Sequence, residues 1–359
     1  MGAAPVRTAD FDYELPPAQI AQVPLADRAA ARLLVLRRGD GALLDRTVRD
    51  LPDLLAPGDI LVINDTRVLP ARLHARRPSG GRVELLLLHP AAPGGAPSGA
   101  WVALARPARR LRPGEHLIPF RPGEASGAEG ADEPIAVREL LGEGRVAVEL
   151  PASGATVAAF LRRWGEVPLP PYIHEVLPDP ERYQTVYART EGSAAAPTAG
   201  LHFTPELLRT LAERGVGHAA ITLHVGLHTF RPVTAEDPRA HAMHAEWYEV
   251  APETAEAVRS ARARGGRVVA IGTTAVRTLE TAAGPEGLRA GSGWTELYIL
   301  PGMRFHAVDA LLTNLHLPRS TLLMLVSAFA GREAVLAAYR HAVAAGYRFF
   351  SFGDAMLIL

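Results

Sequence analysis

The sequence predicts an α/β protein in which a discontinuous mixed α/β domain is interrupted by an inserted small antiparallel β-barrel-like domain. A chain of 359 residues is long enough for two domains. Between residues 67 and 155 the apolar residues form short alternating segments with no helical period, which is typical of a small antiparallel barrel or sandwich. Helices and strands alternate before and after this stretch. We therefore assign residues 1–66 and 156–359 to the α/β domain and residues 67–155 to the insertion.

The first of these segments is interpreted as mixed α/β, and the insertion is interpreted as a set of short strands. The run Asp59–Asn64 is mostly apolar and predicts a buried strand at the end of the first segment. In the insertion we expect strands at Arg82–Leu88, Trp101–Ala105 and Arg145–Leu150. Turns rich in glycine and proline separate them, which supports a barrel of short strands.

Element boundaries are clearest in the last segment. Thr204 is a predicted N-cap, followed by a proline and an acidic residue, and Gly215 ends this helix. Residues 221–228 alternate between apolar and polar side chains and predict a strand. Two further apolar runs predict strands that lead into helices. Residues 266–272 precede a helix that begins near Thr273, and residues 309–314 come before an apolar helix that begins at Thr321.

The composition excludes several kinds of chemistry. All 38 basic residues are arginine and 38 residues are acidic, and this neutral balance argues against indiscriminate coating of nucleic acid. The absence of cysteine excludes disulfides, thiolate metal sites and a cysteine nucleophile. The absence of lysine excludes a Schiff base and a phosphate-loop lysine. Glycine-rich nucleotide loops and the common hydrolase and zincin motifs are also missing.

No segment is expected to enter a membrane. The longest apolar run, Leu322–Ala330, is shorter than the ~20 residues needed to cross a bilayer. Residues 1–15 reach acidic side chains without an apolar core, which does not fit a secretion signal. The expectation is a cytoplasmic enzyme with no membrane partner.

Polar side chains gather where three predicted strands end. In open α/β sheets, ligands bind outside the carboxyl ends of strands. A Gly-Thr-Thr junction before a helix also offers backbone N–H groups to a carboxylate or phosphate. Two alternatives stay open: the threonines only cap their helix, and Arg277 only pairs with Glu280 on one helix face. The candidate binding residues are Asn64, Asp65, Thr66, Arg67, Thr273, Thr274, Arg277, Asn314 and His316.

A second polar cluster lies just before the capped helix and contains Thr198, Gly200, His202 and Thr204. Small residues let backbone approach a ligand closely, and a histidine can transfer a proton near neutral pH. The alternative is that His202 is a structural histidine.

The other histidines do not indicate a metal site. His224 and His228 would lie ~13 Å apart on one strand, too far to share a metal ion. His241 and His244 are close in sequence, but no motif rich in carboxylates accompanies them. We therefore expect no metal.

Arginines are concentrated in the insertion and just after it. Such a cluster is consistent with a face that contacts nucleic-acid phosphates, with Trp164 available to stack on a base. The alternative is an ordinary solvated surface in an arginine-rich protein. The residues concerned are Arg72, Arg76, Arg77, Arg82, Arg106, Arg109, Arg110, Arg112, Arg162 and Arg163.

Taken together, the motifs resemble those of the S-adenosylmethionine:tRNA ribosyltransferase-isomerases of queuosine biosynthesis over nearly the whole chain. So many ordered matches are far more specific than any single motif. They are Phe11–Pro16, Ile20–Gln22, Asn64–Arg67, Ala71–Leu73, Pro168–Ile173, Tyr183–Ala188, Ala195–Thr204, Thr222–Gly226, Thr229, Phe230, Met243, His244, Glu246, Gly272–Thr274, Arg277–Glu280, Pro301, Gly302, Thr313, Asn314, His316–Pro318, Tyr347–Ser351 and Gly353–Met356.

This resemblance implies transfer and isomerisation of the ribosyl part of S-adenosylmethionine onto 7-aminomethyl-7-deazaguanine at the tRNA wobble position. The implied products are epoxyqueuosine-tRNA, adenine and methionine. S-adenosylmethionine is then the ribosyl donor substrate, no prosthetic group or metal is required, and the partner is tRNA carrying the deazaguanine. We expect a monomer or a weak homodimer.

The implied chemistry needs groups that move protons near neutral pH. The candidates inside family motifs are His202, His224, His244, Glu246 and Asp354, with His202 and His224 preferred. The methionine carboxylate is expected either on the Gly-Thr-Thr junction with Arg277 or on Arg67. Gly226 and Thr229 complete the expected substrate site. The residues expected to bind tRNA are Arg72, Arg76, Arg106, Arg109, Arg110, Arg162 and Arg163.

Two positions depart from the family pattern. His228 stands where the family usually has glycine, and His174-Glu175 stand where it usually has an arginine soon after a tyrosine–isoleucine pair. Two further hypotheses therefore remain. One is a relative that uses S-adenosylmethionine with another acceptor, and the other is an inactive relative that only binds RNA.

Overall fold

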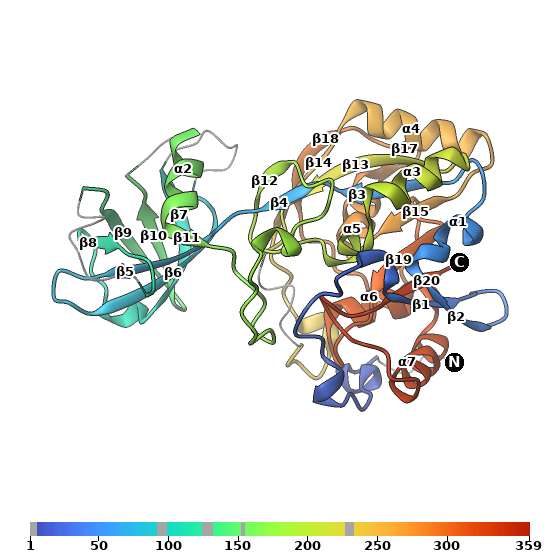
Figure 1. Cartoon of the computed structure of the whole chain (residues 1–359), viewed down its shortest axis with the longest axis horizontal. Coiled ribbons are helices and arrows are strands. Elements are labelled where there is room, and N and C mark those ends of the chain that lie inside the picture. The colour runs from blue at the N-terminus through green and yellow to red at the C-terminus, as the bar shows by residue number, and fades with distance from the viewer. Residues whose placement is uncertain (1–5, 92–98, 124–131, 152–154, 227–232) are drawn as a thin grey trace. The chain divides into compact units, whose positions relative to one another are not determined.

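A computed structural model describes residues 6–91, 99–123, 132–151, 155–226 and 233–359 of the chain. The chain forms two compact units (Figure 1). The α/β unit comprises Met1–Arg67, Pro170–Thr190 and Ala196–Leu359, and the barrel unit comprises Val68–Leu169 and Glu191–Ala195. The predicted fold class, a mixed α/β domain with an antiparallel barrel-like insertion, is confirmed.

A nine-stranded mixed sheet forms the centre of the α/β unit, with the order β18-β14-β13-β3-β15-β19-β20-β1-β2. β13, β3, β15 and β19 are parallel neighbours, and β14, β20 and β2 add antiparallel pairs. The strands are β1 (Arg32–Leu36), β2 (Leu43–Thr47), β3 (Ile60–Asn64), β13 (Gly217–Leu223), β14 (Glu246–Val250), β15 (Val268–Ile271), β18 (Gly291–Thr295), β19 (Ala310–Asn314) and β20 (Ala355–Ile358).

Every residue of β3, β15, β19 and β20 is buried, so both faces of the central sheet are covered. On one face, Leu207, Leu211 and Phe203 pack into a cluster with Ile63 and Ile271. The helical elements of this unit are α1 (Leu51–Leu54), the short 3₁₀ helix η7 (Thr198–His202), α3 (Pro205–Glu213), α4 (Pro252–Ala263), α5 (Thr273–Ala282), α6 (Thr321–Ala330) and α7 (Arg332–Ala344).

Local sequence signals placed several of these elements correctly. The Thr204 hydroxyl accepts the N–H of Leu207 at 3.1 Å, so the predicted N-cap of α3 is confirmed. Gly215 follows this helix with φ of +80°, a left-handed conformation that favours glycine. The strand predicted over residues 221–228 is placed too far along the chain, since β13 runs from Gly217 to Leu223 and residues 227 and 228 lie outside the described residues. The side chain of His228 lies outside the described residues.

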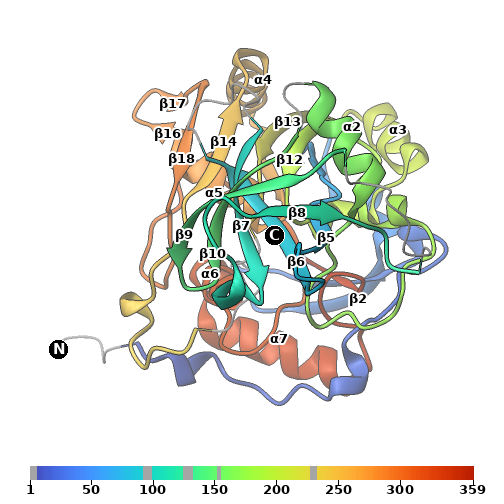
Figure 2. The same cartoon turned by 90° about the vertical axis from the view of Figure 1, so that its left-hand side faces the viewer.

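Six strands of the barrel unit close on themselves. They follow the order β5-β6-β7-β10-β9-β8, and pairing of β5 with β8 closes the barrel. The short strand β11 pairs with the other end of β5, at Arg72 and Leu73. The barrel strands β5 to β10 are labelled in Figure 2. The strands are β5 (Arg72–Arg76), β6 (Arg82–Pro90), β7 (Ala100–Arg106), β8 (His116–Pro119), β9 (Ile135–Gly142), β10 (Arg145–Glu149) and β11 (Gly165–Glu166). The remaining short strands of the chain are β4 (Thr66–Val68), β12 (Thr190–Ser193), β16 (Ala283–Gly284) and β17 (Gly287–Leu288).

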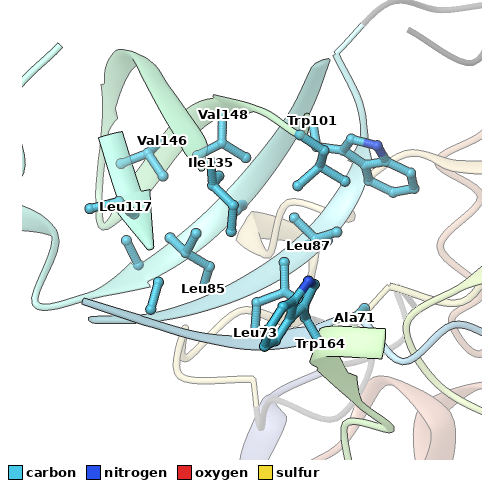
Figure 3. Close-up of a cluster of buried hydrophobic side chains, with 14 of the residues drawn as sticks. Ala71, Leu73, Leu85, Leu87, Trp101, Leu117, Ile135, Val146, Val148 and Trp164 are labelled. Atoms are coloured by element: carbon cyan, nitrogen blue, oxygen red, sulfur yellow. The ribbon is translucent and has the colours of Figure 1, made fainter. Parts of the chain in front are cut away.

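The barrel interior is filled by alternate side chains of its strands, among them Leu73, Leu85 and Val148 (Figure 3). The helix α2 (Ala155–Trp164) belongs to the same core, because its Leu161 and Trp164 are buried in that cluster. The barrel unit therefore runs on past residue 155, where the sequence analysis placed the end of the insertion, to Leu169.

Among the described residues, no single helix is both long and apolar enough to cross a membrane. The pair α6 and α7 reaches the necessary length and hydropathy together, but it bends by 117° between the two helices.

Candidate functional site

The carboxyl ends of β3, β15 and β19 lie together because these three strands are parallel neighbours. Residues at the carboxyl ends of β15 and β19 help to line a hollow, called here the strand-end hollow, which is partly open to solvent. Five predicted site residues line it, namely Thr198, Thr273, Thr274, Asn314 and His316. The rest of the wall is Ala196, Pro197, Ala199, Val225, Gly272, Thr313, Leu322, Phe350 and Ser351.

The first turn of α5 gives this hollow a helix N-terminus. Its N-cap residue Gly272 has φ of +87°, and a Cβ there would lie 3.4 Å from the Ala199 Cβ. None of the described side chains caps α5, so the alternative that the threonines only cap it is wrong. The hydroxyl of Thr274 instead accepts a hydrogen bond from Asn64 Nδ2 at 3.2 Å. Backbone N–H groups and the positive end of the helix dipole therefore favour an anionic ligand group here.

Asn64 is part of the framework of the hollow. Its fully buried side chain bonds to the N–H and the C=O of Leu223, each at 3.0 Å, and to the N–H of Thr66 at 3.2 Å. Together with the bond to Thr274, these contacts join β3 to β13 and to α5. Asn64 therefore positions the strand ends instead of offering a free amide to a ligand.

Side chains after β19 are anchored in a similar way. Asn314 Oδ1 accepts the Thr198 hydroxyl at 2.8 Å, and its Nδ2 donates to the carbonyl oxygen of Phe350 at 3.1 Å. His316 Nε2 lies 3.0 Å from the hydroxyl of Thr313. Burial lowers the pKa of His316 to about 3, so its ring is neutral near pH 7.

His224 is held in one orientation next to Val225 of the hollow. Its Nδ1 lies 2.8 Å from Thr66 Oγ1, and its ring stacks on Trp247 with centroids 5.1 Å apart. Burial lowers the pKa of His224 to about 4, and the carboxylate of Asp65 opposes this shift. Nε2 makes no hydrogen bond to any described residue. When Nδ1–H donates to Thr66, Nε2 carries the lone pair that can accept a proton.

Arg277 and Glu246 form a buried ion pair, in which both side chains are 5% exposed. The guanidinium also donates to the carbonyl oxygens of Leu297 at 2.9 Å and Thr295 at 3.3 Å. The other carboxylate oxygen accepts the N–H of Gly226 at 2.7 Å. These contacts tie Arg277 to the protein itself, and it is not among the residues that line the hollow.

The alternative pairing of Arg277 with Glu280 is wrong. The carboxylate of Glu280 accepts the backbone N–H groups of His306, Ala307 and Val308 at 2.9, 2.9 and 3.1 Å. Glu280 therefore fixes the loop that leads into β19.

Two predicted proton carriers have surroundings that favour structural roles. His202 is 5% exposed, and its two ring nitrogens each lie 3.0 Å from a backbone carbonyl oxygen, that of Ala199 and that of Gly353. Burial lowers the pKa of this imidazole as well. The carboxylate of Asp354 accepts two backbone N–H groups, at 2.9 and 2.8 Å. Neither residue lines the strand-end hollow.

The remaining predicted residues do not contribute to the wall of the hollow. His244 is exposed. Arg67 forms an ion pair with Glu181. Thr229 lies outside the described residues.

Gly200 allows the side chains of Tyr187 and Thr185 to pack closely against the backbone. A Cβ at this position would lie 2.1 Å from the Tyr187 hydroxyl oxygen and 2.8 Å from Thr185 Cγ2. We expect Gly200→Ala to lower the free energy of unfolding by about 1–3 kcal/mol through overpacking, measured by urea denaturation. Gly217→Ala is the matched control, since nothing lies within 4 Å of its Cβ. Equal stability of the two variants would contradict this packing role.

All seven arginines predicted to bind tRNA belong to the barrel unit. Three of them lie near carboxylates: Arg72 is 3.9 Å from Glu84, Arg162 is 3.9 Å from Glu191, and Arg163 is 3.0 Å from Glu133. The prediction that Trp164 stacks on a base is wrong, because this side chain is 3% exposed and lies in the barrel core. The other four are Arg76, Arg106, Arg109 and Arg110.

Sequence reasoning missed several residues of the site. Val225, Leu322, Phe350 and Ser351 line the hollow, and Trp247 stacks on His224. Phe350 and Ser351 fall inside a motif already noticed, so a signal existed for them, whereas nothing local marks Leu322 or Trp247. Within the part of the chain that the structure describes, no three His, Asp or Glu side chains are grouped as metal ligands would be.

Fold and hollow together define an α/β protein with an inserted β-barrel and a hollow of mixed polar and apolar lining at the carboxyl edge of its sheet. A family model described as "Queuosine biosynthesis protein" matches residues 8–358. The chain belongs to this family.

Relatives of known name share the full length of the chain. The S-adenosylmethionine:tRNA ribosyltransferase-isomerase of Moorella thermoacetica is 56% identical, over 99% of this chain and 100% of the relative. The protein of the same name from Symbiobacterium thermophilum is 54% identical over the same shares. A crystal structure of the S-adenosylmethionine tRNA ribosyltransferase of Thermotoga maritima matches with a TM-score of 0.55 and 38% identity, covering 98% of this chain and 100% of that one.

Proposed function

We propose that this protein is an S-adenosylmethionine:tRNA ribosyltransferase-isomerase. In this reaction it transfers and isomerises the ribosyl group of S-adenosylmethionine onto 7-aminomethyl-7-deazaguanine at the wobble position of tRNA. The C–N bond to adenine and the C–S bond to methionine break, and the product is epoxyqueuosine-tRNA. The observation that carries the proposal is the 56% identity, over full length, to a relative of that name.

The strand-end hollow supports this proposal as the place of the donor. A methionine carboxylate is an anionic group of the kind that the N-terminus of α5 favours. Thr273, Thr274 and Ser351 supply hydroxyl groups around it, while Val225 and Phe350 supply apolar contacts. S-adenosylmethionine is a substrate in this scheme, and the chain needs no resident cofactor.

Among the five candidate proton carriers, the geometry favours His224. Its ring is neutral near pH 7 and fixed by Thr66 and Trp247. His202, Glu246 and Asp354 are engaged by protein groups instead. We assign His224 the transfer of a proton from the acceptor amine or from the ribosyl group.

The test is release of adenine from S-adenosylmethionine. We expect adenine only with tRNA that carries the aminomethyl-deazaguanine, and mass spectrometry of the digested tRNA should then show epoxyqueuosine. Unmodified tRNA is the control. Adenine release with a different acceptor alone would favour a relative of altered specificity, and no release with any tRNA would contradict the proposal.

A further inference from the structure

One outer row of the barrel carries several basic side chains, of which only some lie near a carboxylate. Along β5, Leu73 and Ala75 are buried in the barrel, so Arg72, His74 and Arg76 point to its outer side. In the register of β5 and β6, Arg76 lies directly opposite Arg82. The two guanidinium groups therefore project from the same face of the barrel wall.

Phe120 lies beside this arginine pair. Its backbone N–H donates to the carbonyl oxygen of His74 at 2.9 Å, which places it at the edge of β5. The guanidinium carbons of Arg76 and Arg82 lie 4.8 and 5.7 Å from the centre of its ring. Stacking of this kind holds a guanidinium in place and leaves its charge and its N–H donors available.

Arg72 and His74 each lie near a carboxylate, but within the described part of the chain Arg76 and Arg82 do not. Arg72 lies 3.9 Å from Glu84, and His74 lies 3.4 Å from Glu166. Among the described residues, neither Arg76 nor Arg82 forms an ion pair with a carboxylate. Like charges directly opposite each other in a sheet are destabilising. An arrangement that holds two cations together is therefore suited to an anion bound between them.

We propose that Arg76 and Arg82 form a phosphate clamp for the backbone of tRNA, with Phe120 as a positioning residue that holds both guanidinium groups. This inference rests on the proposed function for the identity of the polyanion. It singles out two arginines from the larger cluster that the sequence indicates as a possible phosphate-contacting face. A clamp of this kind contacts phosphates and so carries no base specificity of its own.

The test compares two double variants with the same change in net charge. Arg76→Ala with Arg82→Ala removes the clamp. Arg138→Ala with Arg145→Ala removes two other barrel arginines, which are paired with Glu149 and Glu143. We measure the dissociation constant of tRNA by filter binding at several salt concentrations, and check the fold of each variant by circular dichroism.

For the clamp variant we expect tRNA binding to weaken about 10-fold or more, and the salt dependence, the slope of log K against log salt, to fall by about 2. The KM for S-adenosylmethionine should not change. The control variant should bind tRNA within about 2-fold of the wild type, because its arginines are neutralised within the protein. Equal weakening in both variants, or none in the clamp variant, would overturn the inference.

Phe120 offers an independent test of the positioning role. Phe120→Leu should weaken tRNA binding several-fold. Phe120→Tyr should bind tRNA as the wild type does, because tyrosine keeps the aromatic face. A Phe120→Tyr variant that binds tRNA as weakly as Phe120→Leu would count against the positioning role.

Because the clamp test measures tRNA binding directly, its result does not depend on catalysis. A wild-type protein that binds tRNA through the clamp but releases no adenine contradicts the proposed function and leaves the clamp standing.

Discussion

His224→Ala is expected to lower the rate of adenine release by about 100- to 10,000-fold, the usual contribution of a positioned proton carrier. The expectation rests on a neutral imidazole that Thr66 and Trp247 hold in one orientation. The rate is measured at saturating S-adenosylmethionine and modified tRNA. His218→Ala is the matched control, since His218 is an exposed histidine near the start of β13, the strand that ends just before His224. A His224→Ala enzyme with wild-type rates would remove this residue from the chemistry.

The pKa of His224 also predicts the acid side of the pH profile. Burial lowers this pKa from 6.5 to about 4, so the free base persists well below neutral pH. If His224 accepts the proton, kcat/KM should hold as the pH falls through 6.5 and decline only towards about 4. Stability changes in the same pH range, because His224 takes up a proton at a higher pH in the unfolded chain than in the folded one. The free energy of unfolding therefore falls as the pH drops from 6.5 towards about 4. Circular dichroism at each pH therefore accompanies the rate measurement.

Arg277→Met is expected to lower the free energy of unfolding by about 3–5 kcal/mol, because it removes one member of a buried ion pair. Urea denaturation measures the loss. The double variant Arg277→Met with Glu246→Leu should recover most of it, since both members of the buried ion pair are then replaced by apolar side chains.

An exposed pair provides the comparison for this result. Arg259 and Glu256 lie 2.9 Å apart with side chains 57% and 63% exposed, so Arg259→Met should cost about 0–1 kcal/mol. Suppose instead that Arg277→Met unfolds like the wild type and only raises the KM for S-adenosylmethionine. Arg277 would then be a ligand group for the donor, as its motif first indicated.

Much of the fold could be predicted because its signals are local. The apolar run of β3, the N-cap at Thr204 and the short alternating strands of the insertion each depend on a few neighbouring residues. Closure of the barrel between β5 and β8 depends on pairing between distant segments, and nothing in either strand specifies its partner. The same holds for α2, whose apolar side indicates that it packs on something but not that it packs on the barrel.

The position of the candidate site could be predicted from the sequence, but the roles of its residues could be predicted only in part. The rule that ligands bind at the carboxyl ends of strands located Thr273, Thr274 and Asn314 correctly on one hollow. The sequence could not show which polar side chains are already hydrogen-bonded or ion-paired within the protein. The partners of Arg277 and His202, such as Glu246 and Gly353, come from other segments of the chain and are unknown until it folds.

The position of β20 in the sheet bears on how the protein is made. This strand, Ala355–Ile358, lies between β19 and β1, so β1 gains its inner neighbour only after residue 358 has been synthesised. The barrel strands all lie between residues 72 and 166 and can pair while the ribosome is still working. Until β20 has been made, the nascent chain can hold a paired barrel beside a sheet in which β1 lacks its inner neighbour, and such an exposed strand edge favours aggregation.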